Sequence, residues 1–165
     1  MSIPDTMKIF LVDDDKMFME SMKHYLSQEG VEIKTFLTGE ECLGNLEKED
    51  PKVVILDYYL NSNCAFAMNG IQVMNKIKQS NPDTEVIMLS SQDDVNIAVD
   101  TMKYGAYDYI TKGVSAGIKI KNAVRHILDN IEKTDDFDKK AKRFRRISIA
   151  VVALVFIAYI LNRIL

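Results

Sequence analysis

Several charged or hydroxyl side chains in this sequence stand directly after a short apolar run. They are Asp13 and Asp14, Asp57, Ser90 and Lys112. Runs of this length and composition are typical of strands that are buried on both faces. Open parallel sheets place their chemistry at the carboxyl ends of the strands. We therefore expect carboxylates, a hydroxyl and an ammonium group to meet in one crevice.

The elements that position these groups alternate regularly along the chain. The runs that predict strands are residues 7–12, 31–36, 52–57, 85–89 and 107–110. Apolar residues at helical spacing predict helices over residues 16–28, from about residue 39, over 70–80, 95–102 and 114–131. Five repeats of strand and helix predict an α/β domain with a doubly wound parallel sheet, because right-handed crossovers allow little else.

Charge is distributed unevenly over the 165 residues. Residues 1–138 hold all 24 acidic residues and 14 basic ones, a formal charge of −10, whereas residues 139–165 hold seven basic residues and no acid. An acidic domain argues against binding to nucleic acid, so we expect no such partner. Two cysteines are too few for a disulfide framework, and the first residues lack the pattern of a secretory signal. These features predict a cytoplasmic, reduced domain.

The order of the motifs resembles the receiver domain of bacterial response regulators, over about residues 8–131. Four motifs carry the resemblance: Ile-Phe-Leu-Val-Asp-Asp-Asp, Val-Val-Ile-Leu-Asp, Val-Ile-Met-Leu-Ser-Ser and Gly-Ala-Tyr-Asp-Tyr-Ile-Thr-Lys. They match, in order, the acidic pair at Asp13 and Asp14, the phosphoacceptor at Asp57, the hydroxyl at Ser90, and the switch aromatic and lysine at Tyr109 and Lys112. No single motif is specific, but four in this order and spacing are.

The resemblance implies a flavodoxin-like (βα)5 fold in which Asp57 accepts a phosphoryl group. The donor would be a sensor histidine kinase or a phosphotransfer protein, and the chain would catalyse only its own phosphorylation and dephosphorylation. Carboxylates packed closely together repel one another and usually need a cation. Mg²⁺ prefers oxygen ligands, so the resemblance places it on Asp13, Asp14, Asp57 and the backbone carbonyl of Tyr59. An alternative for Asp13 to Asp15 is a helix N-cap.

The resemblance also implies a switch. Lys112 and the Ser90 hydroxyl would contact phosphoryl oxygens, and Ser90 and Tyr109 would move together to reshape a protein-binding surface. That surface would include Asn96, Asp100, Lys103, Tyr104 and Lys119. The expected partners are a downstream protein and, after phosphorylation, a second copy of the chain.

Two departures from the family pattern favour a rival function, a degenerate receiver that acts as a phosphorylation-independent scaffold. Gly113 follows Lys112 where receivers usually have a proline. The segment between Asp57 and Gly70 carries about five extra residues, near 61–65, and no proline. A second rival, a phosphatase of the haloacid dehalogenase type, requires an acid two residues after the nucleophile. Tyr59 stands there, at a position where receivers tune hydrolysis of the acyl phosphate.

The last part of the sequence differs in character from the rest. We expect a receiver domain over residues 1–132, a polar and then basic juxtamembrane linker over 133–146, and a transmembrane helix over 147–165. Six basic residues precede the apolar run, which would place the receiver in the cytoplasm of a membrane-anchored, single-domain regulator in contact with the lipid bilayer. The alternatives are an oligomerising or buried helix, an interfacial segment and, for the basic run alone, a nucleic-acid patch.

Overall fold

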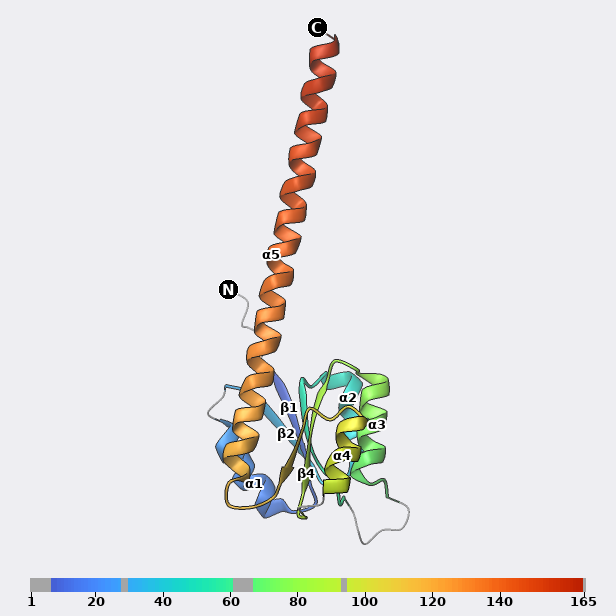
Figure 1. Cartoon of the computed structure of the whole chain (residues 1–165), viewed down its shortest axis with the longest axis vertical. Coiled ribbons are helices and arrows are strands. Elements are labelled where there is room, and N and C mark those ends of the chain that lie inside the picture. The colour runs from blue at the N-terminus through green and yellow to red at the C-terminus, as the bar shows by residue number, and fades with distance from the viewer. Residues whose placement is uncertain (1–6, 28–29, 61–66, 93–94, 165) are drawn as a thin grey trace. The chain divides into compact units, whose positions relative to one another are not determined.

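The computed structural model describes residues 7–27, 30–60, 67–92 and 95–164 and confirms the predicted parallel sheet (Figure 1). The strands are β1 (Lys8–Val12), β2 (Glu32–Phe36), β3 (Val53–Asp57), β4 (Glu85–Ser90) and β5 (Asp108–Thr111). Their spatial order is β2-β1-β3-β4-β5, and all four pairings are parallel. Every residue of the central strand β3 is buried, which explains its unbroken apolar sequence before Asp57.

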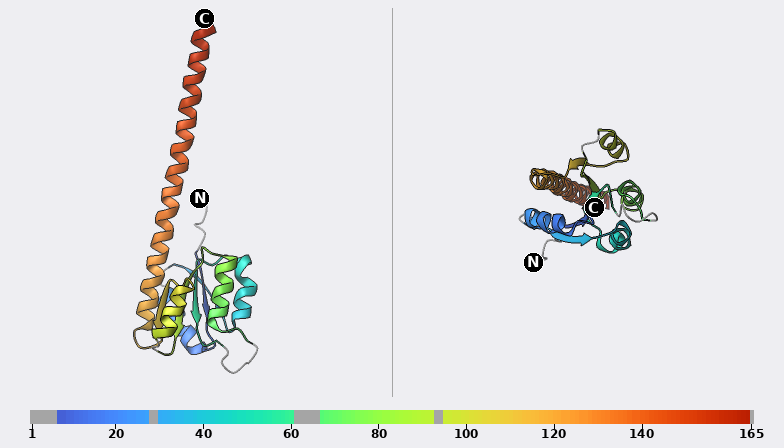
Figure 2. Two further views of the ribbon diagram at one scale, coloured as in Figure 1. Left: turned by 45° about the vertical axis from the view of Figure 1, so that its right-hand side comes forward. Right: turned by 90° about the horizontal axis from the view of Figure 1, so that it is seen from below.

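Helices cover both faces of the sheet, as the alternating pattern predicted. They are α1 (Lys16–Leu26), α2 (Gly39–Glu49), α3 (Gly70–Ser80), α4 (Val95–Lys103) and α5 (Ala116–Ile164). The first turns of α5 lie with α1 on one face of the sheet, and α2, α3 and α4 lie on the other (Figure 2). The chain therefore has the flavodoxin-like α/β architecture that the sequence indicated.

Gly70 fits α3 against the end of β3. A Cβ atom at this position would lie 2.7 Å from Tyr58 Cα and would also collide with the Asp57 carbonyl oxygen. The Gly70 amide instead donates a hydrogen bond to the Tyr58 carbonyl at 3.0 Å. Because glycine has no side chain, the backbone that leaves Asp57 can be held tightly beneath the site.

Helix α5 is longer than the sequence pattern suggested. It runs without a break from Ala116 to Ile164, where we expected a polar joint at residues 133–138. After Gly117 the sequence contains neither glycine nor proline, so no residue forces a break. The chain divides into two compact units, Met1–Ile127 and Leu128–Leu165. The first holds the sheet and α1 to α4, and the second consists of the later part of α5.

The predicted transmembrane helix at residues 147–165 is wrong. Within the described ranges, no helix contains a segment that is both long enough and apolar enough to cross a membrane. The apolar run at 147–161 has basic residues before it and Asn162 and Arg163 after it. As a helix it extends roughly 22 Å, less than the hydrocarbon thickness of about 30 Å. The membrane location and the bilayer contact that this run led us to expect are corrected accordingly.

Candidate functional site

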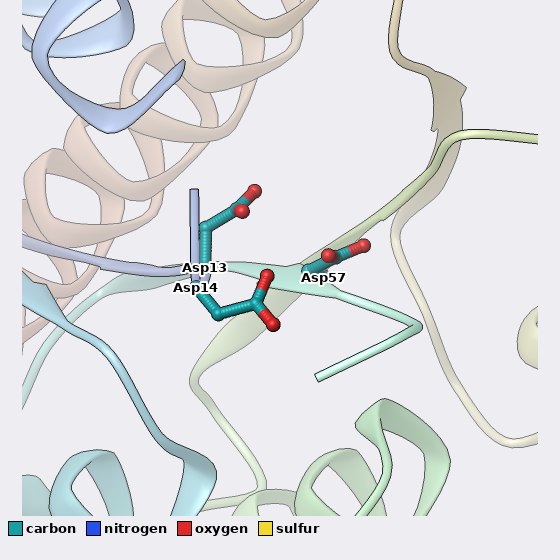
Figure 3. Close-up of side chains that lie close together, drawn as sticks. All are labelled: Asp13, Asp14 and Asp57. Carbon is teal, nitrogen blue, oxygen red and sulfur yellow. The ribbon is translucent and has the colours of Figure 1, made fainter. Parts of the chain in front are cut away.

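Asp13, Asp14 and Asp57 come together at the carboxyl ends of β1 and β3 and form what we call the acidic pocket. Val12 pairs with Leu56 in the sheet, so the residues that follow them in the two strands are neighbours. One carboxylate oxygen from each residue lies within 4.8 Å of the others, and the Asp13 and Asp14 side chains extend toward the side on which Asp57 lies (Figure 3). Asp13 and Asp57 are buried, whereas Asp14 is exposed. The site thus combines two enclosed carboxylates with one that faces solvent.

Asp15 has a different role from its two neighbours. It is the N-cap of α1, and its carboxylate accepts hydrogen bonds from the amides of Met17 at 2.9 Å and Phe18 at 3.0 Å. The Asp15 amide in turn donates to Asp13 Oδ1 at 2.9 Å. The capping alternative therefore applies to Asp15, and it leaves Asp14 and the second oxygen of Asp13 in the acidic pocket.

Lys112 reaches the acidic pocket from the end of β5. Its ammonium donates a hydrogen bond to Asp57 Oδ2 at 2.9 Å and lies 2.7 Å from Asp13 Oδ2. The Lys112 amide donates to the Ser90 carbonyl at 2.7 Å, which fixes the start of the loop after β5. The described residues contain no cis peptide bond, and Gly113 still leaves Lys112 beside Asp57. Gly113 in place of the usual proline therefore does not take Lys112 away from Asp57.

The electrostatics of the pocket favour a cation. Burial raises the pKa of Asp13, against the opposing effects of Lys112 and the Asp15 amide. Burial alone would lower the pKa of Lys112, but the carboxylates of Asp13 and Asp57 outweigh it, so the pKa lies above its ordinary value. Three carboxylates and one ammonium give a formal charge of −2.

The groups present fit a hard divalent cation. Every donor in the acidic pocket is an oxygen atom, the type that Mg²⁺ prefers. Asp13 Oδ2 is buried and, among the described residues, accepts no well-aligned hydrogen bond despite its close contact with Lys112. A divalent ion would neutralise the remaining charge of the pocket.

Gln92 connects three residues around the site, and the sequence analysis did not identify it. Its amide donates to the buried Ser90 Oγ at 3.1 Å, and its carbonyl accepts a hydrogen bond from the Tyr109 hydroxyl at 2.7 Å. Its side-chain oxygen accepts one from the Tyr59 hydroxyl at 3.2 Å. Two of these bonds use main-chain atoms of Gln92, so residue type gave no signal. The predicted pair Ser90 and Tyr109 is thus joined through the main chain of one residue, Gln92.

Two further predictions concern the loop after Asp57. The Tyr59 amide lies 3.4 Å from Asp57 Oδ1, a long contact that keeps the backbone of Tyr59 close to the carboxylate. The insertion expected at residues 61–65 lies outside the described residues.

A second residue that the sequence analysis missed is Phe18, whose ring centroid is 4.9 Å from Lys112 Nζ. A lone aromatic in an amphipathic helix looks like an ordinary core residue.

Comparison with known proteins agrees with this geometry. Residues 9–125 match the family model described as the response regulator receiver domain. The chain is 29% identical over 117 residues to the C4-dicarboxylate transport transcriptional regulatory protein DctD of Rhizobium meliloti strain 1021, which covers 71% of this chain and 24% of that protein. The chain therefore spans about a quarter of the length of this relative.

Solved structures show the same fold. The signal receiver domain of a putative Luxo repressor protein from Vibrio parahaemolyticus superposes with a TM-score of 0.70 at 26% identity, covering 79% of this chain and 95% of that one. The receiver domain of DrrB, a response regulator of Thermotoga maritima, in its BeF3-activated form superposes with a TM-score of 0.66 at 32% identity, covering 75% of this chain and 98% of that one. With its parallel sheet and its acidic pocket, this chain belongs to the response regulator receiver domain family and is a phosphoacceptor of two-component signalling.

Proposed function

We propose that Asp57 is the residue that accepts the phosphoryl group, from a sensor histidine kinase or a phosphotransfer protein. The observation that carries this proposal is the placement of the Asp57 carboxylate. It is buried at the end of the central strand, 2.9 Å from the Lys112 ammonium and within the acidic pocket. Asp14 is exposed, whereas phosphoryl transfer needs a site shielded from water. Asp13 is buried, and one of its oxygens already accepts a hydrogen bond from the Asp15 amide. Asp57 is therefore the best-placed nucleophile of the three.

Asp13, Asp14, Asp57 and the backbone carbonyl of Tyr59 would hold Mg²⁺. Bound there, the ion supplies neutralisation of charge on the phosphoryl oxygens. The protein's own groups do the rest by positioning. Asp57 attacks phosphorus as an in-line nucleophile, and the bond from phosphorus to the donor's leaving atom breaks.

Lys112 and Ser90 would assist the transfer from the protein side. The Lys112 ammonium, already beside Asp57 Oδ2, is placed to bind one oxygen of the incoming group. Ser90 Oγ is buried and accepts from Gln92, so its own O–H can donate to another oxygen. Both groups then act on charge that develops during the transfer.

Phosphorylation would be transmitted through Ser90 to Tyr109. If Ser90 is drawn toward the phosphoryl group, the Gln92 amide that donates to it would follow, and Tyr109 is hydrogen-bonded to the carbonyl of the same residue. Tyr109 lines a surface hollow of about 490 Å³ formed by β5 and the first turns of α5. That hollow also contains Lys119, one of the residues predicted for the output surface.

The output surface would bind a protein. We place on it Asn96, Asp100, Lys103, Tyr104 and Lys119. The exposed apolar side chains Val95, Val99 and Met102 on α4 add area suited to a protein contact. The partner would be a downstream protein or a second copy of this chain. Within the sequence, we assign residues 1–132 to the receiver, which agrees with the compact unit Met1–Ile127, and 133–146 to a polar and basic linker.

The test is to incubate the full chain with acetyl phosphate and to measure phosphoryl uptake as an increase in the mass of the intact protein. The unmodified protein should gain one phosphoryl group in the presence of Mg²⁺ and none when the metal is chelated. Asp57→Asn should gain none under either condition and should still unfold cooperatively. Asp14→Ala should require far more Mg²⁺. Labelling of the Asp57→Asn protein would overturn the assignment, and no phosphoryl uptake by the unmodified protein even with Mg²⁺ present would favour the scaffold.

A further inference from the structure

We propose that Phe18 is a positioning residue that holds the Lys112 ammonium in place for phosphoryl transfer. The Lys112 Nζ atom lies 4.9 Å from the centroid of the Phe18 ring, within the range of a cation–π contact. Phe18 is half-buried in the first turn of α1. Its amide donates to the Asp15 side chain at 3.0 Å, so the N-cap fixes the backbone that carries the ring.

Lys112 needs such a contact because the residues after it do not brace its side chain. Gly113 is exposed, and among the described residues no atom lies within 4 Å of the Cβ position it lacks. Val114 and Ser115 are exposed as well. A lysine side chain has four rotatable carbon–carbon bonds and carries considerable rotamer entropy. The position of the ammonium must therefore be set by groups at its tip.

Three groups at the tip hold the ammonium: Asp13, Asp57 and Phe18. The two carboxylates are also the groups that would bind Mg²⁺, so the metal and Lys112 would share the same two side chains. The ring face of Phe18 is not a ligand for a hard cation. It is the contact that remains when the carboxylates turn to the metal, and this reasoning rests on the proposed function.

Two substitutions distinguish the effect of the aromatic face of Phe18 from the effect of its size. Phe18→Leu keeps an apolar side chain but removes the aromatic face, and Phe18→Tyr keeps the face. Tyr25→Leu is the matched control, because Tyr25 lies on the same helix and its ring packs against Gly117 instead of Lys112. All variants are made in the full chain, and their thermal unfolding is recorded first.

The first measurement is the proton chemical shift of the Lys112 ε-methylene group without any phosphodonor. The Phe18 ring should shift these protons upfield, an effect that is lost in Phe18→Leu and kept in Phe18→Tyr and Tyr25→Leu. The second measurement is the rate of phosphoryl uptake from acetyl phosphate at saturating Mg²⁺. Phe18→Leu should be about 3- to 10-fold slower, as expected for a cation–π contact of ordinary strength, whereas Phe18→Tyr should stay close to the unmodified protein.

Each outcome decides the proposal. Unchanged ε-methylene shifts or an unchanged uptake rate in Phe18→Leu would overturn it. Equal slowing in Phe18→Leu and Phe18→Tyr, or in Tyr25→Leu, would show a merely structural role and would also overturn it. If the unmodified protein takes up no phosphoryl group, the proposed function fails. The ε-methylene shifts would then still report whether Phe18 holds Lys112.

Discussion

Two clusters of charged side chains lie at opposite ends of β1 and differ in how their charge is balanced. At its start, Glu49 of α2 contacts Lys8 at 2.9 Å and Lys34 of β2 at 2.7 Å, and we call these three residues the ion-pair cluster. Hydrogen bonds from Lys34 and then Lys8 lower the pKa of Glu49 to about 2. At the other end of β1, burial raises the pKa of Asp13 in the acidic pocket.

The difference indicates which cluster serves stability and which serves binding. In the ion-pair cluster two cations surround one anion, and both contacts are short. In the acidic pocket three carboxylates share one ammonium among the described residues, so a net negative charge remains there. A protein tolerates such an excess where a ligand can offset it. The carboxyl ends of the strands therefore hold the cluster suited to a ligand, and the amino ends hold a cluster whose charges are paired within the protein.

The largest effect should come from removing the cation of the acidic pocket. Lys112→Met leaves Asp13 buried beside Asp57 with no positive partner, which should lower the free energy of unfolding by about 3 kcal/mol without divalent ions. Urea denaturation in the presence of a chelator measures this loss in the free energy of unfolding. Lys8→Met in the ion-pair cluster should cost much less, because Lys34 still pairs with Glu49. Similar losses in the two variants would erase the distinction.

A smaller effect is expected from the backbone beneath the acidic pocket. Gly70→Ala places a methyl group against Tyr58 and the Asp57 carbonyl, which should destabilise the protein by about 2 kcal/mol. Gly44→Ala in the interior of α2 is the control. No described atom lies within 4 Å of the added methyl group there, so helix propensity should stabilise it by up to about 1 kcal/mol. Thermal unfolding of both variants shows whether each change stabilises or destabilises the protein. An unchanged stability of Gly70→Ala would mean that the loop after Asp57 relaxes to accept the methyl group.

Magnesium should act on one end of β1 and not on the other. At ten times its Kd, Mg²⁺ should stabilise the unmodified protein by about 1.4 kcal/mol, because it binds the folded state. Asp14→Asn should lose this gain, since it removes an exposed ligand of the acidic pocket. Glu49→Gln should keep it. The comparison would fail if both variants responded to Mg²⁺ equally.

The smallest effect concerns pH and the ion-pair cluster. The pKa of Glu49 in the folded protein, about 2, lies below its ordinary value of 4.5. The ionised form is therefore favoured by folding, so the contribution is complete above about pH 4.5 and is lost as the pH falls through 2. Glu49→Gln should be slightly less stable than the unmodified protein at neutral pH, and the difference should close on acidification. A constant difference across this window would show that Glu49 acts through packing.

The sequence predicted the parts of this molecule that depend on local pattern. Buried runs such as residues 53–57 end in the residue that the sheet presents at its edge, so the pattern brought Asp57 and Lys112 to one edge, and the resemblance to receiver domains supplied their roles. The continuous course of α5 was not predicted, because a polar composition at 133–138 does not by itself end a helix. The transmembrane prediction failed because it counted apolar residues across Asn162 and Arg163.

Other parts of the site depend on contacts that no local pattern contains. Phe18 meets Lys112 only because α1 and the end of β5 are brought together by folding. Gln92 acts through its amide and carbonyl, which every residue except proline possesses. The roles of Phe18 and Gln92 depend on which residues lie beside them in the folded protein, and residue type alone does not indicate these neighbours.

The bonding of Gln92 has a consequence for how this protein can vary. The link between Ser90 and Tyr109 runs through the main chain of residue 92, and the contact with Tyr59 runs through its side chain. A substitution at residue 92 other than proline can therefore remove the contact with the Tyr59 hydroxyl and keep the main-chain link between Ser90 and Tyr109. On the proposed function, the lifetime of the signal and its transmission would depend on separate atoms of one residue. Each can thus be adjusted on its own.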